Sequence, residues 1–201
     1  LAIVNVNDPE KTITVSNIPI SVTNESAITS RDMVYNVKSE QYLNITVSGK
    51  RSIVSNLSAE DFRATASLKE LSKVNSIPVD VTTKNASLGR KITIVKQSAQ
   101  TILVDVENVE EKDFTDLVVE YTGKVADGYV AGLSSMSTDE VTVKAPTSII
   151  DKIKKVAVRC SLDGTNTNIS KKCPVILYDK NDKEIKSDEI ELSDKKIRVN
   201  V

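Results

Sequence analysis

The chain has 201 residues, with 27 Lys and Arg against 28 Asp and Glu, a formal net charge of −1, no His and no Trp. This balanced charge argues against a nucleic-acid-binding protein, which needs a basic surface to neutralise phosphates. The absence of His excludes Ser-His-Asp and Cys-His triads and His-based zinc sites. Aromatic residues, at 3%, are too few for a stacking platform or a sugar-binding groove.

Runs in which apolar and polar residues alternate occur along the whole chain. A period of two is the signature of half-buried strands. The predicted strands lie at residues 13–15, 18–22, 43–47, 77–81, 102–106, 117–121, 141–143, 156–158, 175–178 and 197–201. Val and Ile supply more than half of the apolar residues, and branched side chains favour pleated sheets. The pattern predicts a mostly β fold, either a sandwich or a barrel.

The two halves of the chain match each other at four places. Residues 47–54 match 143–150, residues 64–68 match 158–162, residues 77–81 match 173–177, and residues 102–106 match 197–201. The offsets are 96, 94, 96 and 95 residues. A shared strand chemistry explains the alternation but not the near-constant offset. We therefore predict two tandem domains, residues 1–107 and 108–201, joined by a short acidic hinge at 107–112.

Each predicted domain also contains one short helical turn. Residues 52–57 and 148–154 place apolar side chains four apart, which puts them on one helix face. In the first domain, Ser58 followed by Glu60 and Asp61 offers a second helix start with acids in its first turn. We interpret these turns as structural.

The two cysteines, Cys160 and Cys173, do not form a C-x-x-C pair, which rules out a zinc ribbon or a thioredoxin-like motif. Free cysteines behave as small buried apolar residues, so the favoured interpretation is two buried thiols. A disulfide between them is the alternative, and it requires Cα atoms closer than about 7 Å.

The order of elements resembles the YbbR-like domain family. The resemblance rests on an early strand at residues 18–22, a segment at 43–54 that corresponds to the pattern h-T-V-x-V-x-G-x-x-x-h-h, a helical turn running into a strand at 57–68, an h-P-V strand at 77–81 and a closing strand at 102–106. The first repeat fits along its whole length, whereas the second is looser because Ala145-Pro146 replaces the Gly49 position. The resemblance implies two small β domains with crossing strands, similar to the β domain of a ribosomal protein.

The resemblance also implies a function. Such proteins carry an N-terminal membrane helix, and residues 1–7 look like the exit from that helix. The expected role is that of a non-enzymatic extracytoplasmic module in a Gram-positive bacterium. It would regulate a membrane diadenylate cyclase, which makes cyclic di-AMP, by protein contact, in part through the anchoring helix. No cofactor and no nucleic-acid partner are expected.

Other classes of function find less support in the sequence. Neighbouring carboxylates such as Glu189 and Glu191 are typical of a solvated face rather than of a catalytic pair. Residues 179–184 lack the glycine and the spaced acids of a calcium loop, and a hairpin turn fits them better. A generic cell-surface spacer or adhesion module remains the alternative to a cyclase regulator.

We assign no catalytic, cofactor-binding or metal-binding residue from the sequence, and the partner-binding surface is unknown. Three positions that match the family pattern have structural explanations. Gly49 is expected in a turn, Pro78 at a strand edge and Leu68 in the core.

Overall fold

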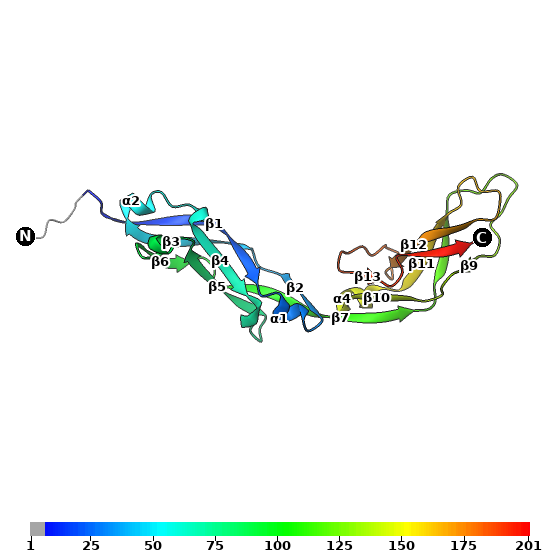
Figure 1. Cartoon of the computed structure of the whole chain (residues 1–201), viewed down its shortest axis with the longest axis horizontal. Coiled ribbons are helices and arrows are strands. Elements are labelled where there is room, and N and C mark those ends of the chain that lie inside the picture. Colours follow the sequence, from blue (N-terminus) through cyan, green and yellow to red (C-terminus); the bar gives the residue numbers. More distant parts are fainter. Residues whose placement is uncertain (1–6) are drawn as a thin grey trace, which may run out of the picture. The chain divides into compact units, whose positions relative to one another are not determined.

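The computed structural model describes residues 7–201, and it confirms the mostly β fold. The chain divides into two compact units, Leu1–Val106 and Glu107–Val201, each with its own hydrophobic core (Figure 1). This boundary lies one residue before the predicted one. The expectation of a helix exit at residues 1–7 falls almost entirely on residues 1–6, outside the described residues.

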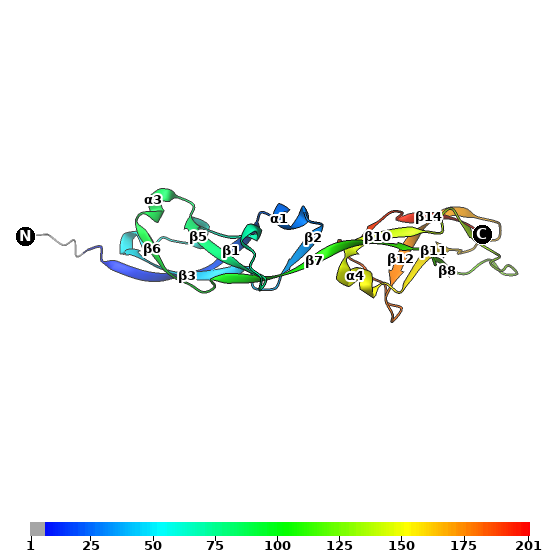
Figure 2. The same ribbon diagram turned by 90° about the horizontal axis from the view of Figure 1, so that it is seen from below.

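The first unit is an open sheet in which one long strand pairs with one neighbour along its first part and with another along its last part. Its elements are β1 (Glu10–Thr23), α1 (Ser26–Thr29), β2 (Met33–Val37), β3 (Tyr42–Lys50), α2 (Arg51–Val54), η1 (Ala59–Asp61), β4 (Phe62–Ser67), η2 (Leu68–Glu70), β5 (Ser76–Thr83), α3 (Ala86–Gly89), β6 (Ile92–Gln97) and the first part of β7 (Thr101–Phe114). The strand order is β7-β5-β4-β1-β3-β6, with β2 paired to β7. Figure 2 shows α3 beside β6 at one end of this unit.

The predicted strands at 13–15 and 18–22 are one strand, β1, with an irregular register between Val15 and Ile18. Asn17 lies in the left-handed region with φ 59°, and its N–H donates to Asn44 Oδ1 at 3.0 Å. Asn tolerates this conformation better than most residues because its short side chain is polar. The irregularity lets the start of β1 pair antiparallel with β3 while its end pairs parallel with β4.

The second unit repeats this arrangement of strands. Its elements are the end of β7, β8 (Val118–Thr122), β9 (Ser135–Met136), β10 (Val141–Pro146), α4 (Thr147–Lys152), β11 (Lys155–Ser161), β12 (Ser170–Tyr178), β13 (Glu191–Leu192) and β14 (Lys196–Asn200). The end of β7 pairs antiparallel with β10, and β8 pairs parallel with β11. The end of β7 and β8 together take the positions that β1 holds alone in the first unit, so the crossing-strand topology occurs twice.

Residues 107–112, predicted as a short linking segment that acts as a hinge, are part of a strand rather than an irregular linker. Residues 101–114 form the single strand β7, and Val109 to Phe114 pair with Pro146 to Val141 of β10. The acidic composition suggested a linker, but ladder hydrogen bonds come from the backbone and tolerate solvated side chains on an exposed strand. Residues 109–114 therefore belong to the sheet of the second unit.

Each core is built from the apolar faces of the strands. The described residues contain no buried polar or charged side chain. The fully buried side chains include Ile18, Ile45 and Ile102 in the first unit and Val143, Val158 and Ile197 in the second. Because period-two alternation sends polar side chains to the outer face, short strands can bury apolar residues and stay solvated.

The predicted helical turns are present as α2 and α4. In each, a serine of the first turn donates hydrogen bonds to a carboxylate that is distant in the sequence. Asp8 accepts hydrogen bonds from the Ser52 N–H at 2.8 Å and the Ser52 hydroxyl at 2.6 Å. Glu107 does the same for Ser148, at 2.8 and 3.0 Å. Free N–H groups at a helix start need acceptors, so the carboxylates satisfy them in both units.

Candidate functional site

The three positions that the sequence analysis singled out are structural. Leu68 is 2% exposed and lies in the core, as predicted. Gly49 lies within β3 rather than in a turn, so that prediction is wrong. An added Cβ there would meet Val54 Cγ1 at 3.1 Å and the Lys91 carbonyl oxygen at 3.2 Å. The backbone at Gly49 thus packs closely against α2 and the start of β6, and a larger side chain would require these neighbours to move.

Pro78 lies in β5, which runs between β4 and β7 and is therefore not an edge strand. The ladder with β4 stops at Val79, whose own N–H donates to the Gln100 carbonyl oxygen at 2.9 Å on the other side. The missing proline N–H thus breaks no hydrogen bond in either ladder. The edge assignment is wrong, and the local end of one ladder is the physical reason that proline fits.

The most connected group of polar side chains lies on the outer face of the second unit. The Tyr178 hydroxyl donates to Glu120 Oε2 at 2.5 Å and accepts from Arg159 Nη2 at 2.8 Å. Arg159 also lies 3.7 Å from Glu120 and 3.9 Å from Glu184. The hydrogen bond that Arg159 donates to Tyr178, together with the two carboxylates, raises the pKa of Arg159. These side chains form hydrogen bonds and ion pairs with one another across β8, β11 and β12. The network therefore has a structural role, because it links neighbouring strands.

Residues 179–184 form a turn, as predicted, and not an open cation loop. Asp179 accepts hydrogen bonds from the N–H groups of Asn181 and Lys183 at 2.8 and 3.0 Å, and Tyr178 pairs with Glu184. The Lys183 and Asn181 bonds hold the pKa of Asp179 below its usual value. Within residues 7–201, no group of three or more His, Cys, Asp and Glu could hold a metal ion.

The structure joins Cys160 and Cys173 in a disulfide with a Cα–Cα distance of 5.3 Å. The favoured expectation of two free thiols is wrong, and the alternative is confirmed. Val158 of β11 lies opposite Val175 of β12, and continuing this register brings the two cysteines face to face. Sequence spacing could not reveal the pairing because it depends on the register of two strands.

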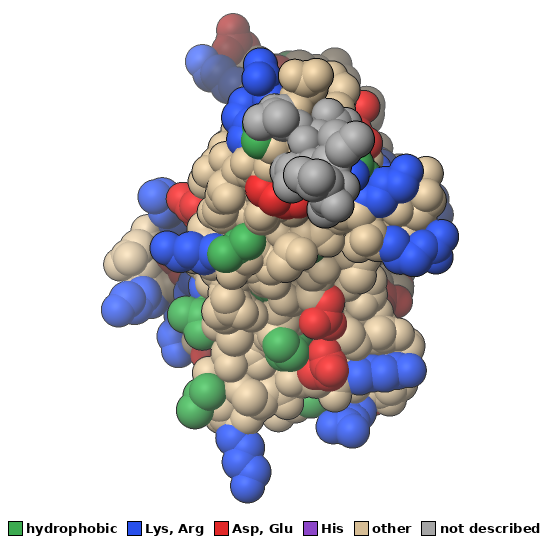
Figure 3. Space-filling model, turned by 90° about the vertical axis from the view of Figure 1, so that its left-hand side faces the viewer, with side chains coloured by type: hydrophobic (Ala, Val, Ile, Leu, Met, Phe, Trp, Pro, Cys, Tyr) green, Lys and Arg blue, Asp and Glu red, His purple; other side chains and the backbone are tan. Residues whose placement is uncertain are grey.

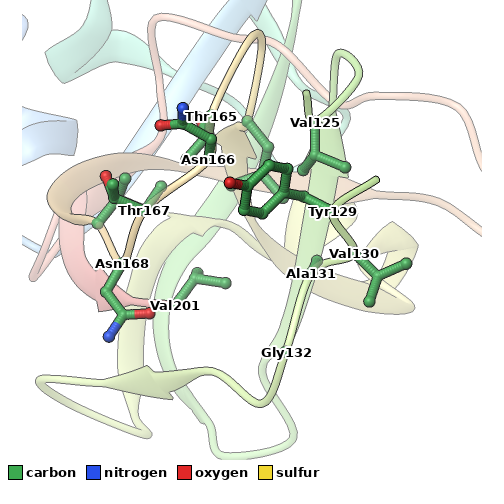
Figure 4. A pocket seen from close by; sticks show the side chains of 12 residues that line it. Val125, Tyr129, Val130, Ala131, Gly132, Thr165, Asn166, Thr167, Asn168 and Val201 are labelled. Carbon is green, nitrogen blue, oxygen red and sulfur yellow. The ribbon is translucent and has the colours of Figure 1, made fainter. Parts of the chain in front are cut away.

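A cavity of about 280 Å³ lies between two loops of the second unit (Figure 4). No charged side chain lines it. Its lining residues are Val125, Tyr129, Val130, Ala131, Gly132, Leu162, Thr165, Asn166, Thr167, Asn168, Ile169 and Val201. The first loop follows β8 and the second joins β11 to β12. The sequence analysis missed this site because alternation marks strands and gives no signal in loops.

The loop at residues 123–134 also exposes large apolar side chains. Val130 is 90% exposed and Leu133 is 99% exposed, while Tyr129 is 53% exposed and turns its ring into the cavity (Figure 4). Single exposed apolar residues are common, but several in one loop beside a cavity mark a contact surface. We call Tyr129, Val130 and Leu133 the apolar loop. It is the strongest candidate site for binding a partner in the described part of the chain.

Residues 115–201 match a family model described as YbbR-like protein. Comparison with curated proteins gives no match. A crystal structure of a YbbR-like protein from Streptococcus pneumoniae is 18% identical, with a TM-score of 0.47, covering 96% of this chain and 94% of that chain. The YbbR-like domain of a Listeria monocytogenes protein is 22% identical, with a TM-score of 0.35, covering 48% of this chain and 92% of that chain.

Proposed function

With residues 115–201 a YbbR-like domain, we propose that this chain is a non-enzymatic binding module outside the cytoplasm that regulates a membrane diadenylate cyclase through protein contact. The family match is the observation that carries the proposal, because the resemblance in the sequence implies this role. The first unit enters the proposal as a second YbbR-like domain, since its strands have the same order and directions as those of the second.

The apolar loop is the surface through which we expect a protein partner to be bound. Val130 and Leu133 are almost fully exposed, and removing their apolar side chains from water favours formation of a complex. Tyr129 adds an aromatic ring at the mouth of the neighbouring cavity, and aromatic residues are enriched among the strongest contacts in interfaces. A partner side chain of neutral character fits the uncharged lining.

The disulfide supports the proposed location. Structural disulfides persist in oxidising compartments and are rare in the bacterial cytosol. Cys160 and Cys173 are each 1% exposed, so the bond is shielded from soluble reductants. Among residues 7–201, no helix is long and apolar enough to cross a membrane. Attachment through a preceding helix is part of the proposal.

Regulation by such a module requires a difference in affinity between two states of the cyclase. A module that binds one state more tightly shifts the equilibrium toward that state, and no chemical step is needed. The alternative is a spacer or adhesion module, which the tandem of two similar β units also suits. The two candidates differ in whether loss of the protein changes the level of cyclic di-AMP.

The test combines gene deletion with complementation. Cellular cyclic di-AMP is measured in a deletion strain, and then after expression of the full-length protein or its Val130→Asp/Leu133→Asp variant. We expect deletion to change the level and the variant to fail to restore it. The matched control is Val74→Asp, which alters an apolar residue of the first unit that is 76% exposed. An unchanged level after deletion would contradict the regulatory role and leave the spacer function.

A further inference from the structure

Each unit ends its sheet in an open strand at the same place in the topology. Among the described residues, β6 of the first unit pairs only with β3, and β13 of the second unit pairs only with β10. The two edges are equivalent, since β3 and β10 both follow the crossing strand and lead into the helical turns α2 and α4. An open edge has unpaired backbone groups that can accept another strand.

The two equivalent edges carry opposite charge. The segment from Lys84 to Gln97, which ends in β6, contains four basic residues and no acidic one; these are Lys84, Arg90, Lys91 and Lys96. The segment from Ser187 to Asp194, which contains β13, has four acidic residues and no basic one; these are Asp188, Glu189, Glu191 and Asp194. Figure 3 looks on the side of the molecule at the left of Figure 1, where Lys and Arg side chains lie around the rim with Asp and Glu side chains among them.

These charges are available to another molecule. All four basic residues are exposed, as are Asp188, Glu189 and Glu191. In the part of the chain that the structure describes, none of the eight side chains takes part in an ion pair; the pairs formed are Lys38–Asp105, Lys155–Asp182, Arg159–Glu120, Arg159–Glu184 and Lys186–Glu184. The contrast extends to the whole units: the first has 12 Lys and Arg against 10 Asp and Glu, and the second has 15 against 18.

We propose that the β6 edge of one copy of this chain binds the β13 segment of a second copy. Two β6 edges repel each other, as do two β13 segments, so the charges favour contact between unlike edges. Such a contact is heterologous, and it either closes into a reciprocal dimer or extends to further copies. The apolar contribution comes from Val95, which is 61% exposed on β6, because Ile190 and Leu192 pack against the core of their own unit.

The proposed contact between the β6 edge and the β13 segment is short, and we expect it to be weak. Val95 has no partner on β3, because Thr46 pairs with Lys96 and Val47 with Ile94, so a bulge interrupts the edge. β13 has only two residues in its ladder. Backbone pairing is thus limited to a few residues, and side-chain attraction provides most of the affinity. Exposed ion pairs contribute about 0–1 kcal/mol each and are screened by salt.

The first test is sedimentation of the purified chain at high concentration. We expect the mean mass to rise with protein concentration at an ionic strength of about 0.05 M, where the Debye length exceeds 10 Å, and to return to the monomer at about 1 M, where it is about 3 Å. A monomer at every concentration and at low salt would overturn the proposal. Association that persists unchanged at high salt would overturn it equally, because charge would not be its cause.

The second test reverses each edge separately. The variant Lys91→Glu/Lys96→Glu leaves two basic and two acidic residues in the β6 segment, and the variant Glu189→Lys/Glu191→Lys leaves two acidic and two basic residues in the β13 segment. We expect each alone to associate at least about tenfold more weakly than the unaltered chain, since every contact then includes one edge with no net charge. An equimolar mixture of the two should associate again, because the unaltered β13 segment of the first variant then meets the unaltered β6 edge of the second. Failure of the mixture to associate would overturn the pairing of β6 with β13.

Two matched variants control for net charge and folding. Lys69→Glu/Lys73→Glu and Asp116→Lys/Asp127→Lys make the same changes of charge at exposed residues outside the β6 and β13 segments. We expect these variants to associate like the unaltered chain, and equal loss in them would overturn the role of the edges. Circular dichroism confirms that each variant is folded.

Binding of an unrelated acidic peptide to β6 without self-association would identify a different occupant and overturn the proposal. This association is independent of cyclic di-AMP levels, so it can fail without the proposed function failing.

Discussion

The two units reach the same topology with different local packing. In the first, Ala64 of β4 lies opposite Val81 of β5. The sequence repeat makes Val158 and Leu177 their equivalents, yet Val158 lies opposite Val175. The ladder of the second unit has moved by two residues, which keeps every side chain on its original face. Between the two units, the side of the sheet that each residue faces is therefore conserved, whereas the residue opposite it on the neighbouring strand is not.

The disulfide is the largest chemical difference between the units. The sequence repeat makes Ala66 and Ile77 the equivalents of Cys160 and Cys173, so the first unit has two apolar side chains in place of the covalent bond. We expect the double variant Cys160→Ala/Cys173→Val to lose about 3 kcal/mol of unfolding free energy in the second unit, given a sequence separation of 13. Hydrogen exchange of the full chain, read peptide by peptide, measures this for each unit. Equal loss of protection in both units would contradict the prediction that the disulfide stabilises the second unit alone.

Gly49 and Ala145 occupy equivalent positions near the ends of β3 and β10, and only the second carries a methyl group. An added Cβ at Gly49 meets Ile92 Cγ2 at 3.2 Å, while Ala145 is fully buried without a steric conflict. We expect Gly49→Val to destabilise the first unit by about 1–3 kcal/mol through overpacking. Ala145→Gly, the matched change, should cost the second unit about 1 kcal/mol. Thermal unfolding measures both, and a neutral Gly49→Val would show that α2 yields easily.

The carboxylate caps give the units a similar helix start with different acids. Hydrogen bonds from Ser52 lower the pKa of Asp8 from 3.8. A depressed folded-state pKa means that its stabilisation is present above pH 3.8 and is lost as the pH falls through the lower folded-state value. We expect Asp8→Asn to reduce the acid sensitivity of the first unit selectively. Hydrogen exchange at two pH values checks this, with residues of α4 as the internal control.

Tyr35 of β2 has no counterpart in β9, which carries Met136 at its end. Burial, together with the hydrogen bond to Glu25 at 2.5 Å, raises the pKa of Tyr35 to about 12. A raised folded-state pKa means that the stabilisation is complete below pH 10 and is lost as the pH rises through about 12. We expect Tyr35→Phe to remove this small alkaline loss from the first unit. Ultraviolet titration of tyrosinate measures the pKa, and a normal value would contradict the arrangement.

The repeat and the strands of the core were predictable because their signals are local. Alternation identified the runs at 43–47, 77–81 and 175–178, and the Asn and Asp residues near 181 identified a turn. Strand β6 was missed because the bulge at Val95 breaks the alternation, and β13 was missed because two paired residues carry no pattern. The hinge at 107–112 was mistaken for a linker because its polar side chains are exposed on both faces of β7.

The sequence by itself determined the class of fold, the two units and the resemblance to a family, since periodicity, offset and motif order are all properties of neighbouring residues. The tertiary structure decided which residues meet. It joined Cys160 to Cys173, brought Asp8 to Ser52 and placed Tyr129 beside the second loop. These contacts depend on strand register and loop closure, which act between residues far apart in the chain.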